Sequence, residues 1–362
     1  MKTAHRRSVM STNRERESQT LNFAKPKERG SAMETFFPWD LTVQRFEDEG
    51  MPPNIIDGKT KNLDEKYFPV KWGEGIMDYE AYLGFDSVYR IGFVLPFRKF
   101  EAAAIATMED WQLMKERADK ELEDYFTDEA IEKAYLPIKE GHDRGDYSIR
   151  MNIEGFFWVP RELMGVEEHL YAFYDEPELM HDINQYVLDI YITKLMKVIK
   201  LVQPDVVYIM EDLSGKTGPM ISPDSFEEFV GDYYRKIIPL MKAAGVGNVF
   251  VDTDGDFTRL IPNFIEAGVD GFLPMDVNAG MDIVAVREQF PQLKFIGGFN
   301  KLEIAKGPEA IDAEFARILP VIRGGGYAPG SDHQVAPSTS FEDYQYYIGK
   351  LKEMMSQAGA DI

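Results

Sequence analysis

The sequence contains no cysteine among its 362 residues. This absence excludes disulfide bonds, a thiolate nucleophile and any zinc site with cysteine ligands. Long apolar runs are also missing, since none reaches the roughly 20 residues that a membrane-spanning helix needs. Residues 1–17 are polar and lack the apolar core of a secretory signal. We therefore expect a cytoplasmic protein that acts without a membrane.

Positive charge is scarce in this sequence. Lysine and arginine number 40 against 62 aspartates and glutamates, which gives a formal net charge of −22. A protein that follows nucleic-acid phosphates or an anionic membrane needs a basic face, so neither partner is expected. Apolar residues make up 44% of the chain, with 24 phenylalanines and 18 tyrosines. Such a chain can bury a large core, unlike a disordered one.

Apolar runs alternate with helical patterns along most of the chain. From residue 205 onward five runs predict strands, each followed by a helix, and the first is Val206–Met210. This run is apolar without alternation, which is typical of a parallel strand buried on both faces. Residues 87–96 and 148–158 predict two more strands, and Ala32–Thr35 could supply an eighth. Region 97–146 departs from this alternation, because two predicted helices follow one another there.

Eight such units predict an α/β fold of the TIM (β/α)8 barrel type. A doubly wound sheet is the alternative, but no GxGxxG follows a first strand. Residues 1–75 predict an N-terminal helical and aromatic arm that packs on the barrel, with helices near 12–21 and 40–49. Residues 76–362 would then form the barrel as a single catalytic domain.

Polar side chains gather where the predicted strands end. In a barrel these ends share one mouth, where the chemistry of such enzymes lies. Glu211 continues its strand, whereas Asp212 is expected to point away. The side chains expected at the mouth, which Glu34 could join, are Glu154, Glu211, Asp252, Asp254, Asp276, Asn300, Asp332 and His333.

Asp252 and Asp254 are two residues apart, which places them on the same side of a strand. Two interior carboxylates must share a cation, a proton or a strong donor, because like charges repel in a low dielectric. His333 is the one histidine at a predicted strand end. The mouth suits a metal held by carboxylates and one imidazole, or acid–base catalysis by paired carboxyls. Turns and helix caps are the structural alternatives for the same aspartates.

Three stretches carry a resemblance to a known family. They are SPDSFEEFVGDYYRKIIPLMKAAGVGNVFVDTDGDFTRLIPNFIEAGVDGF, IGGFNK and GGGYAPGSDHQVAPST. The chain resembles the uroporphyrinogen decarboxylase superfamily over roughly residues 12–355, and within it the branch of corrinoid-dependent methyltransferases. The resemblance implies a TIM barrel, in agreement with the alternation of strands and helices.

Two family motifs are altered in this sequence. The decarboxylases carry an Arg-rich RQAGR motif near the N-terminus, and the matching region here is KERGSAMETFF. Thiol-methylating members bind zinc through an HxC pair and a later cysteine. Asp252-Thr253-Asp254 stands at the pair, and the later cysteine falls near Ser331–His333. The resemblance therefore does not imply that this arginine motif binds the substrate, and it does not imply that a thiol is activated.

The activity that the resemblance still implies is transfer of a methyl group from a small donor, such as an aryl methyl ether, to a corrinoid on a carrier protein. Two alternatives stay open: a decarboxylase-like lyase acting on a small acid or porphyrinogen, and a non-catalytic ligand-binding member. Expected partners are a corrinoid-binding protein and the methyl donor, with a homodimer also open.

Candidate residues follow from the predicted mouth and the resemblance together. The cofactor is the partner's corrinoid, with zinc as an open alternative. The candidates are Glu211, Asp254, His333 and Asp276 for catalysis, Glu154, Phe36, Trp39 and Asn300 for substrate binding, and Asp252, Asp254 and His333 for a metal.

Overall fold

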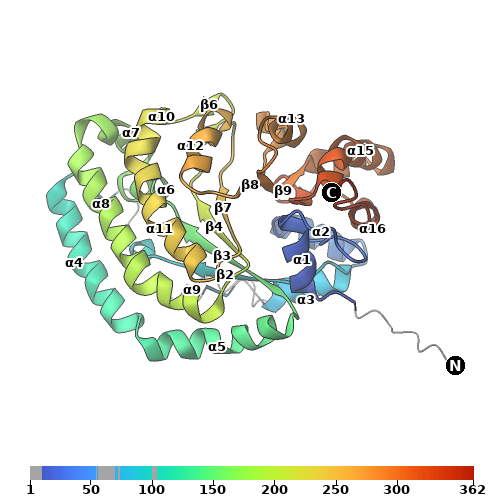
Figure 1. Ribbon diagram of the computed structural model, residues 1–362, viewed down its shortest axis with the longest axis horizontal. Helices are drawn as coiled ribbons and strands as arrows, with labels where there is room; N and C mark the ends of the chain where they lie inside the picture. The colour runs from blue at the N-terminus through green and yellow to red at the C-terminus, as the bar shows by residue number, and fades with distance from the viewer. Residues whose placement is uncertain (1–9, 54, 56–69, 72–73, 100–103) are drawn as a thin grey trace.

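The computed structural model describes residues 10–53, 55, 70–71, 74–99 and 104–362. It contains a curled sheet of eight strands with helices around its outer side (Figure 1), and a two-stranded sheet of β5 (Ser214–Gly215) and β6 (Gly218–Pro219). The larger sheet has the strand order β1-β2-β3-β4-β7-β8-β9-β10. All neighbours from β2 to β10 are parallel, and the bounds are β2 Val88–Phe93, β3 Ser148–Glu154, β4 Val206–Met210, β7 Asn248–Asp252, β8 Gly271–Leu273, β9 Lys294–Phe299 and β10 Tyr327–Ser331. The predicted parallel α/β alternation is thereby confirmed.

Helices follow each of these strands or flank the sheet. The predicted consecutive helices of region 97–146 are present as α4 and α5, outside α8 and α9 in Figure 1. No helix within the described ranges is long and apolar enough to cross a membrane. The helix bounds are α1 Asn13–Leu21, α2 Asp40–Asp48, α3 Glu74–Leu83, α4 Met108–Tyr125, α5 Asp128–Arg144, α6 Trp158–Met164, α7 Val166–Asp175, α8 Pro177–Ile190, α9 Met196–Val202, α10 Pro223–Phe226, α11 Asp232–Ala243, α12 Ile261–Glu266, α13 Ile283–Gln289, α14 Lys301–Ile304, α15 Pro308–Gly324 and α16 Phe341–Met355.

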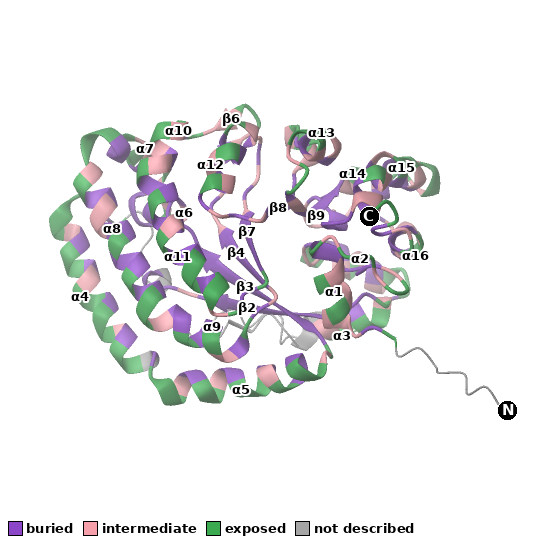
Figure 2. Cartoon of the chain, viewed as in Figure 1, coloured by how far each residue is buried: buried purple, intermediate pink, exposed green. Residues whose placement is uncertain are grey.

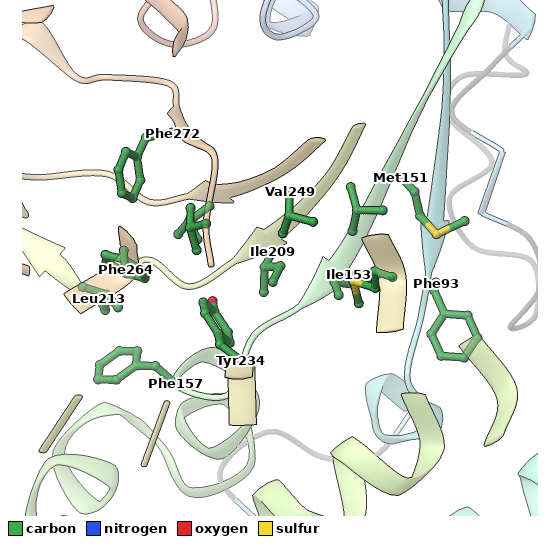
Figure 3. Packing of buried hydrophobic residues seen from close by; sticks show 14 of the residues in the cluster. Phe93, Met151, Ile153, Phe157, Ile209, Leu213, Tyr234, Val249, Phe264 and Phe272 are labelled. Atoms are coloured by element: carbon green, nitrogen blue, oxygen red, sulfur yellow. The ribbon is translucent and has the colours of Figure 1, made fainter. Parts of the chain in front are cut away.

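The strands of the sheet are buried (Figure 2), and two apolar clusters pack against them. One lies between the sheet and the helices, where alternate strand residues such as Met151, Ile209 and Val249 face α-helical side chains (Figure 3). The other is smaller and comes from the opposite face of the strands. It consists of Leu21, Val206, Tyr208, Phe250, Leu273, Ile296 and Ala328, with Phe36 packed against it. Since successive strand side chains point to opposite faces, both sides of β4 and β7 are buried.

The predicted closure into a barrel of eight parallel strands is not confirmed within the described residues. β1 (Val70–Lys71) is antiparallel to β2, and β2 and β10 are not neighbours in the described sheet. Ala32–Thr35 is not a strand, so this prediction was wrong. Side chains explain why: the amide of Ser331 donates to the Glu34 carboxylate, and Arg90 donates to the Glu34 carbonyl. These contacts use the amide of Ser331 and the carbonyl of Glu34, which backbone hydrogen bonds between two strands would need.

The N-terminal arm nonetheless closes the gap between β2 and β10. The helix α1 confirms the helix predicted near 12–21 and begins at a capping box on Thr12. Its Glu17 forms a buried ion pair with Arg150 of β3 at 2.8 Å, and Leu21 joins the smaller core. The described part of the arm therefore packs on the sheet, while the domain boundary at residue 75 stays a prediction.

Candidate active site

Seven ionisable side chains meet beyond the carboxyl ends of β4, β7, β8, β9 and β10. We call them the mouth cluster: Asp212, Asp252, Asp254, Asp276, Lys301, Asp332 and His333. They come from separate strand ends, which parallel topology brings to one edge of the sheet. The predicted gathering of Asp252, Asp254, Asp276 and His333 is present in the structure. Most members of the cluster are aspartates, and Lys301 is the cation among them that opposes their negative charge.

The pair that follows β4 is oriented in the opposite way to our expectation. Val207 and Ile209 face the helices, and the alternation carries Glu211 to the same side. Asp212 has a positive φ of 44°, and its carboxylate turns to the mouth, where it accepts the amide of Asp254 at 3.3 Å. The mouth residue of this pair is therefore Asp212.

Glu211 is fully buried behind the strand. Its carboxylate accepts four hydrogen bonds, from the amides of Phe156, Phe157 and Trp158 and from the hydroxyl of Tyr234, at 2.6–3.0 Å. Burial raises its pKa to about 7, and these donors oppose the rise. These contacts fix the first turn of α6. The structure does not bring Glu211 into the mouth cluster, and its catalytic role stays a prediction.

Asp252 and Asp254 lie on the mouth side of β7 and the loop after it. Burial, together with the charges of Asp212 and Asp254, raises the pKa of Asp252 well above its usual range. Burial and the charge of Asp212 raise the pKa of Asp254 to about 6. Repulsion between close carboxylates makes protonation of some of them favourable. These aspartates can therefore hold a proton near neutral pH.

His333 approaches this acidic group from the loop after β10. Its Nε2 lies 3.8 Å from Oδ2 of Asp254, and its side chain is 34% exposed. Burial and the charge of Lys301 lower its pKa. Nδ1 is buried and has no hydrogen-bond partner among the described residues. The ring of Phe36 lies against the imidazole, with ring centroids 5.4 Å apart. The neutral imidazole is suited to exchange a proton with Asp254.

Asp332 connects three strand-end loops. Its carboxylate accepts the amides of Val277 and Lys301 at 3.1 and 3.0 Å, and also the side-chain amide of Asn278. Burial raises its pKa to about 6, despite these hydrogen bonds and the positive charge of Lys301. Its main role is therefore to hold together the loops after β8, β9 and β10.

Asp276 and Asn300 lie at the edge of the cluster and cap short helical turns. Asp276 accepts the amides of Asn278 and Ala279, and Asn300 accepts the amide of Leu302. The structural alternative weighed for Asp276 is thus present. The side chains of Asn278 and Asn300 are also hydrogen-bonded to each other at 3.3 Å. Capping turns both side chains toward their own loops, and the catalytic role of Asp276 and the binding role of Asn300 stay predictions.

Two other predicted substrate-binding residues lie at the end of β3 and just before α2. Glu154 is buried at the end of β3 and accepts the amide of Leu95 at 3.2 Å. Trp39 is 47% exposed at the start of α2. Phe36, by contrast, touches His333 directly. Of the predicted binding residues, the structure brings Phe36 and Asn300 to the cluster.

Comparison with known proteins assigns the family. A family model for uroporphyrinogen decarboxylase (URO-D) matches residues 105–354. The chain belongs to the URO-D family. It is also similar to the solved structure of a methyltransferase from Methanosarcina mazei, with a TM-score of 0.62 and 14% sequence identity over 94% of this chain and 98% of that chain. At this identity the likeness concerns the fold alone. No curated protein sequence matches the chain.

In this URO-D family member the predicted zinc ligands are not arranged as a metal site. Within the described ranges, no three histidine, cysteine, aspartate or glutamate side chains are placed to hold a metal ion. Zinc also prefers nitrogen and sulfur ligands to an oxygen-rich set. The residues as placed do not fit zinc, and we derive no catalytic step through it.

The sequence did not predict one basic residue that lies near the mouth cluster. Arg161 of α6 donates from Nη1 to the carbonyl of Asp212 at 2.8 Å, and its guanidinium lies 4.1 Å from the ring centroid of Trp158. It makes no ion pair with a described carboxylate. The pattern of α6 gave no signal for it, because the contact depends on the turn that Asp212 makes.

Proposed function

We propose that this URO-D family member is a methyltransferase that moves a methyl group from a small methylated donor, such as an aryl methyl ether, to the corrinoid of a carrier protein. The observation that carries the proposal is the pairing of Asp254 and His333, 3.8 Å apart, within a cluster of aspartates at the strand ends. The likeness to a structure described as a methyltransferase supports it at the level of the fold.

Methyl transfer from an ether requires a proton on the oxygen that leaves. In the transfer the donor's carbon–oxygen bond breaks, its electrons stay on the oxygen, and the acceptor supplies the pair for the new bond to the methyl carbon. An alkoxide or phenoxide leaves poorly unless it is protonated. Asp254, whose pKa is raised to about 6, can donate that proton, and the imidazole of His333 can take a proton from solvent and pass it back to Asp254.

The other proposed roles concern binding. Phe36 packs against His333 and can stack on an aromatic donor, while Asn300 and Asp276 border the same space. The carrier protein would present its corrinoid at this end of the sheet. Decarboxylation of a polycarboxylate is less well supported, because the aspartates of the mouth cluster would repel it.

The test is methyl transfer to free cob(I)alamin and to a carrier protein. The purified chain is incubated with a panel of methyl ethers and methylamines, and methylcobalamin is followed by its absorption. We expect transfer from at least one donor, and a fall of about 100-fold or more in kcat for Asp254→Asn, as for loss of a general acid. Asp282→Asn, an exposed N-cap of α13, is the matched control.

Two results would count against the proposal. One is absence of transfer from every donor with the carrier present. The other is release of carbon dioxide from a porphyrinogen or small acid, which would favour the decarboxylase alternative.

A further inference from the structure

Glu34 is a buried acid that belongs to neither the mouth cluster nor the helix-facing core. It lies in the N-terminal arm, is 3% exposed, and occupies the gap between β2 and β10. Oε1 accepts both the amide and the hydroxyl of Ser331 at 2.8 Å. Oε2 accepts the hydroxyl of Tyr344 in α16 at 3.0 Å. One carboxylate thus joins the arm, the last strand and the last helix.

Ser331 is the residue before Asp332 and His333. On its β9 side, the chain is held by the sheet: Ser331 is in register with Phe299, and the amide of Asp332 donates to the Phe299 carbonyl at 2.7 Å. On its other side no strand is paired within the described ranges, and Glu34 supplies the acceptor instead. The end of β10 is therefore fixed from both sides only when Glu34 is present.

The arm also approaches β10 very closely at the preceding residue. A Cβ on Gly330 would lie 2.4 Å from Oγ1 of Thr35 and 3.1 Å from Oε1 of Glu34. Two residues after Glu34, the ring of Phe36 packs on the His333 imidazole. Residues 34–36 thus contact Gly330, Ser331 and His333.

The loop that continues from His333 is held by α2. Thr42 donates to the carbonyl of Val335 at 2.7 Å, and Arg45 donates to the carbonyl of Pro337 at 2.9 Å. The amide of Phe341 donates to Glu49 at 2.6 Å. The N-terminal arm therefore contacts residues 331–341 along their length, and Glu34 lies at the buried end of this contact.

We propose that Glu34 is a positioning residue that sets the placement of Asp332 and His333 in the mouth cluster. A buried carboxylate costs free energy unless donors satisfy it, and here four donors do so at the strand end. Loss of the acceptor would leave the amide and the hydroxyl of Ser331 without the carboxylate that they contact, and would let the end of β10 move. Only the kinetic readout of this assignment rests on the proposed function.

The experiment compares Glu34→Ala with Glu34→Gln and Tyr344→Phe. Gln keeps an Oε1 acceptor for Ser331, and Tyr344→Phe removes a donor to Glu34 while leaving both Ser331 contacts. The first readout is the rate at which diethyl pyrocarbonate modifies His333, measured by mass spectrometry. The second is hydrogen exchange in peptides covering 327–335. Neither readout depends on methyl transfer.

For Glu34→Ala we expect modification and exchange to be faster by about 10-fold, and kcat of methyl transfer to fall by about 10- to 100-fold with KM within about 3-fold, as for a small misplacement of a catalytic group. Glu34→Gln and Tyr344→Phe should stay within about 3-fold of the unaltered protein in every readout, since the Ser331 contacts survive. If Glu34→Ala does not fold, Glu34→Met fills the volume without an acceptor and replaces it.

A His333 modification rate within 2-fold of the unaltered protein in the Ala or Met variant would overturn the proposal. So would faster modification with an unchanged kcat. If no form of the protein transfers a methyl group, the proposed function fails, and the modification and exchange rates still decide the role of Glu34.

Discussion

Replacement of Glu211 by glutamine offers a quantitative test of the environment behind β4. The carboxylate is fully buried and accepts three backbone amides and one hydroxyl. Burial raises its pKa from 4.5 to about 7. A rise of about 2.5 units corresponds to about 3 kcal/mol, at about 1.4 kcal/mol per unit. This free energy is the amount by which ionisation of Glu211 would lower stability.

The sign follows from which state holds the proton longer. With a folded pKa of about 7 and an unfolded value near 4.5, the folded protein keeps the proton over that interval. Its stabilising effect is complete below the unfolded pKa and is lost as the pH rises through about 7. Glutamine does not titrate. The free energy of unfolding of Glu211→Gln should therefore improve relative to the unaltered protein by about 3 kcal/mol between about pH 4.5 and 8.

Urea unfolding at several pH values measures this difference, with circular dichroism as the signal. Glu288→Gln, an exposed position on α13, is the control and should show no such trend. A constant difference between the Glu211→Gln variant and the unaltered protein would refute the reasoning. A difference of opposite sign would show that the four donors outweigh burial and keep the carboxylate ionised. A large fall in kcat with intact structure would instead support the predicted catalytic role.

Three further predictions concern the same region. Gly155→Ala should destabilise the fold by about 1–3 kcal/mol or more, since its Cβ would lie 2.0 Å from Cδ of Glu211, and a melting curve checks it. Asp252→Asn should raise the melting temperature at about pH 8 but not at about pH 4, because burial and neighbouring charges raise the pKa of Asp252 and its ionisation costs stability; an equal effect at both values would contradict this. The kcat of methyl transfer should fall as the pH rises above about 6, where Asp254 loses its proton, and a profile that is flat there would argue against Asp254 as the acid.

Much of the fold could be predicted from the apolar runs. Val206–Met210 is buried on both faces, and this determines both its strand character and its parallel neighbours. The ends of such strands then meet, which placed Asp252, Asp254 and His333 together in the prediction. Periodicity and strand direction contain this information, and both are local properties of the sequence.

The errors came from contacts that are not local. The orientation of Glu211 and Asp212 depends on a left-handed turn at Asp212, which a strand pattern does not encode. The expected strand at Ala32–Thr35 is replaced by side-chain contacts from Glu34, 297 residues before its partner Ser331. The available signal was Glu34 as the single charged residue within 30–39, and the fold shows that it contacts β10.

The most direct test of the central claim follows the methyl group itself. The purified chain is mixed with a donor carrying a trideuterated methyl group and with cob(I)alamin on its carrier protein, and the corrinoid is analysed by mass spectrometry. The account predicts trideuteromethylcobalamin and the demethylated donor in equal amounts, with loss of both in Asp254→Asn. Demethylated donor without labelled corrinoid, or an equal yield from Asp254→Asn, would contradict it.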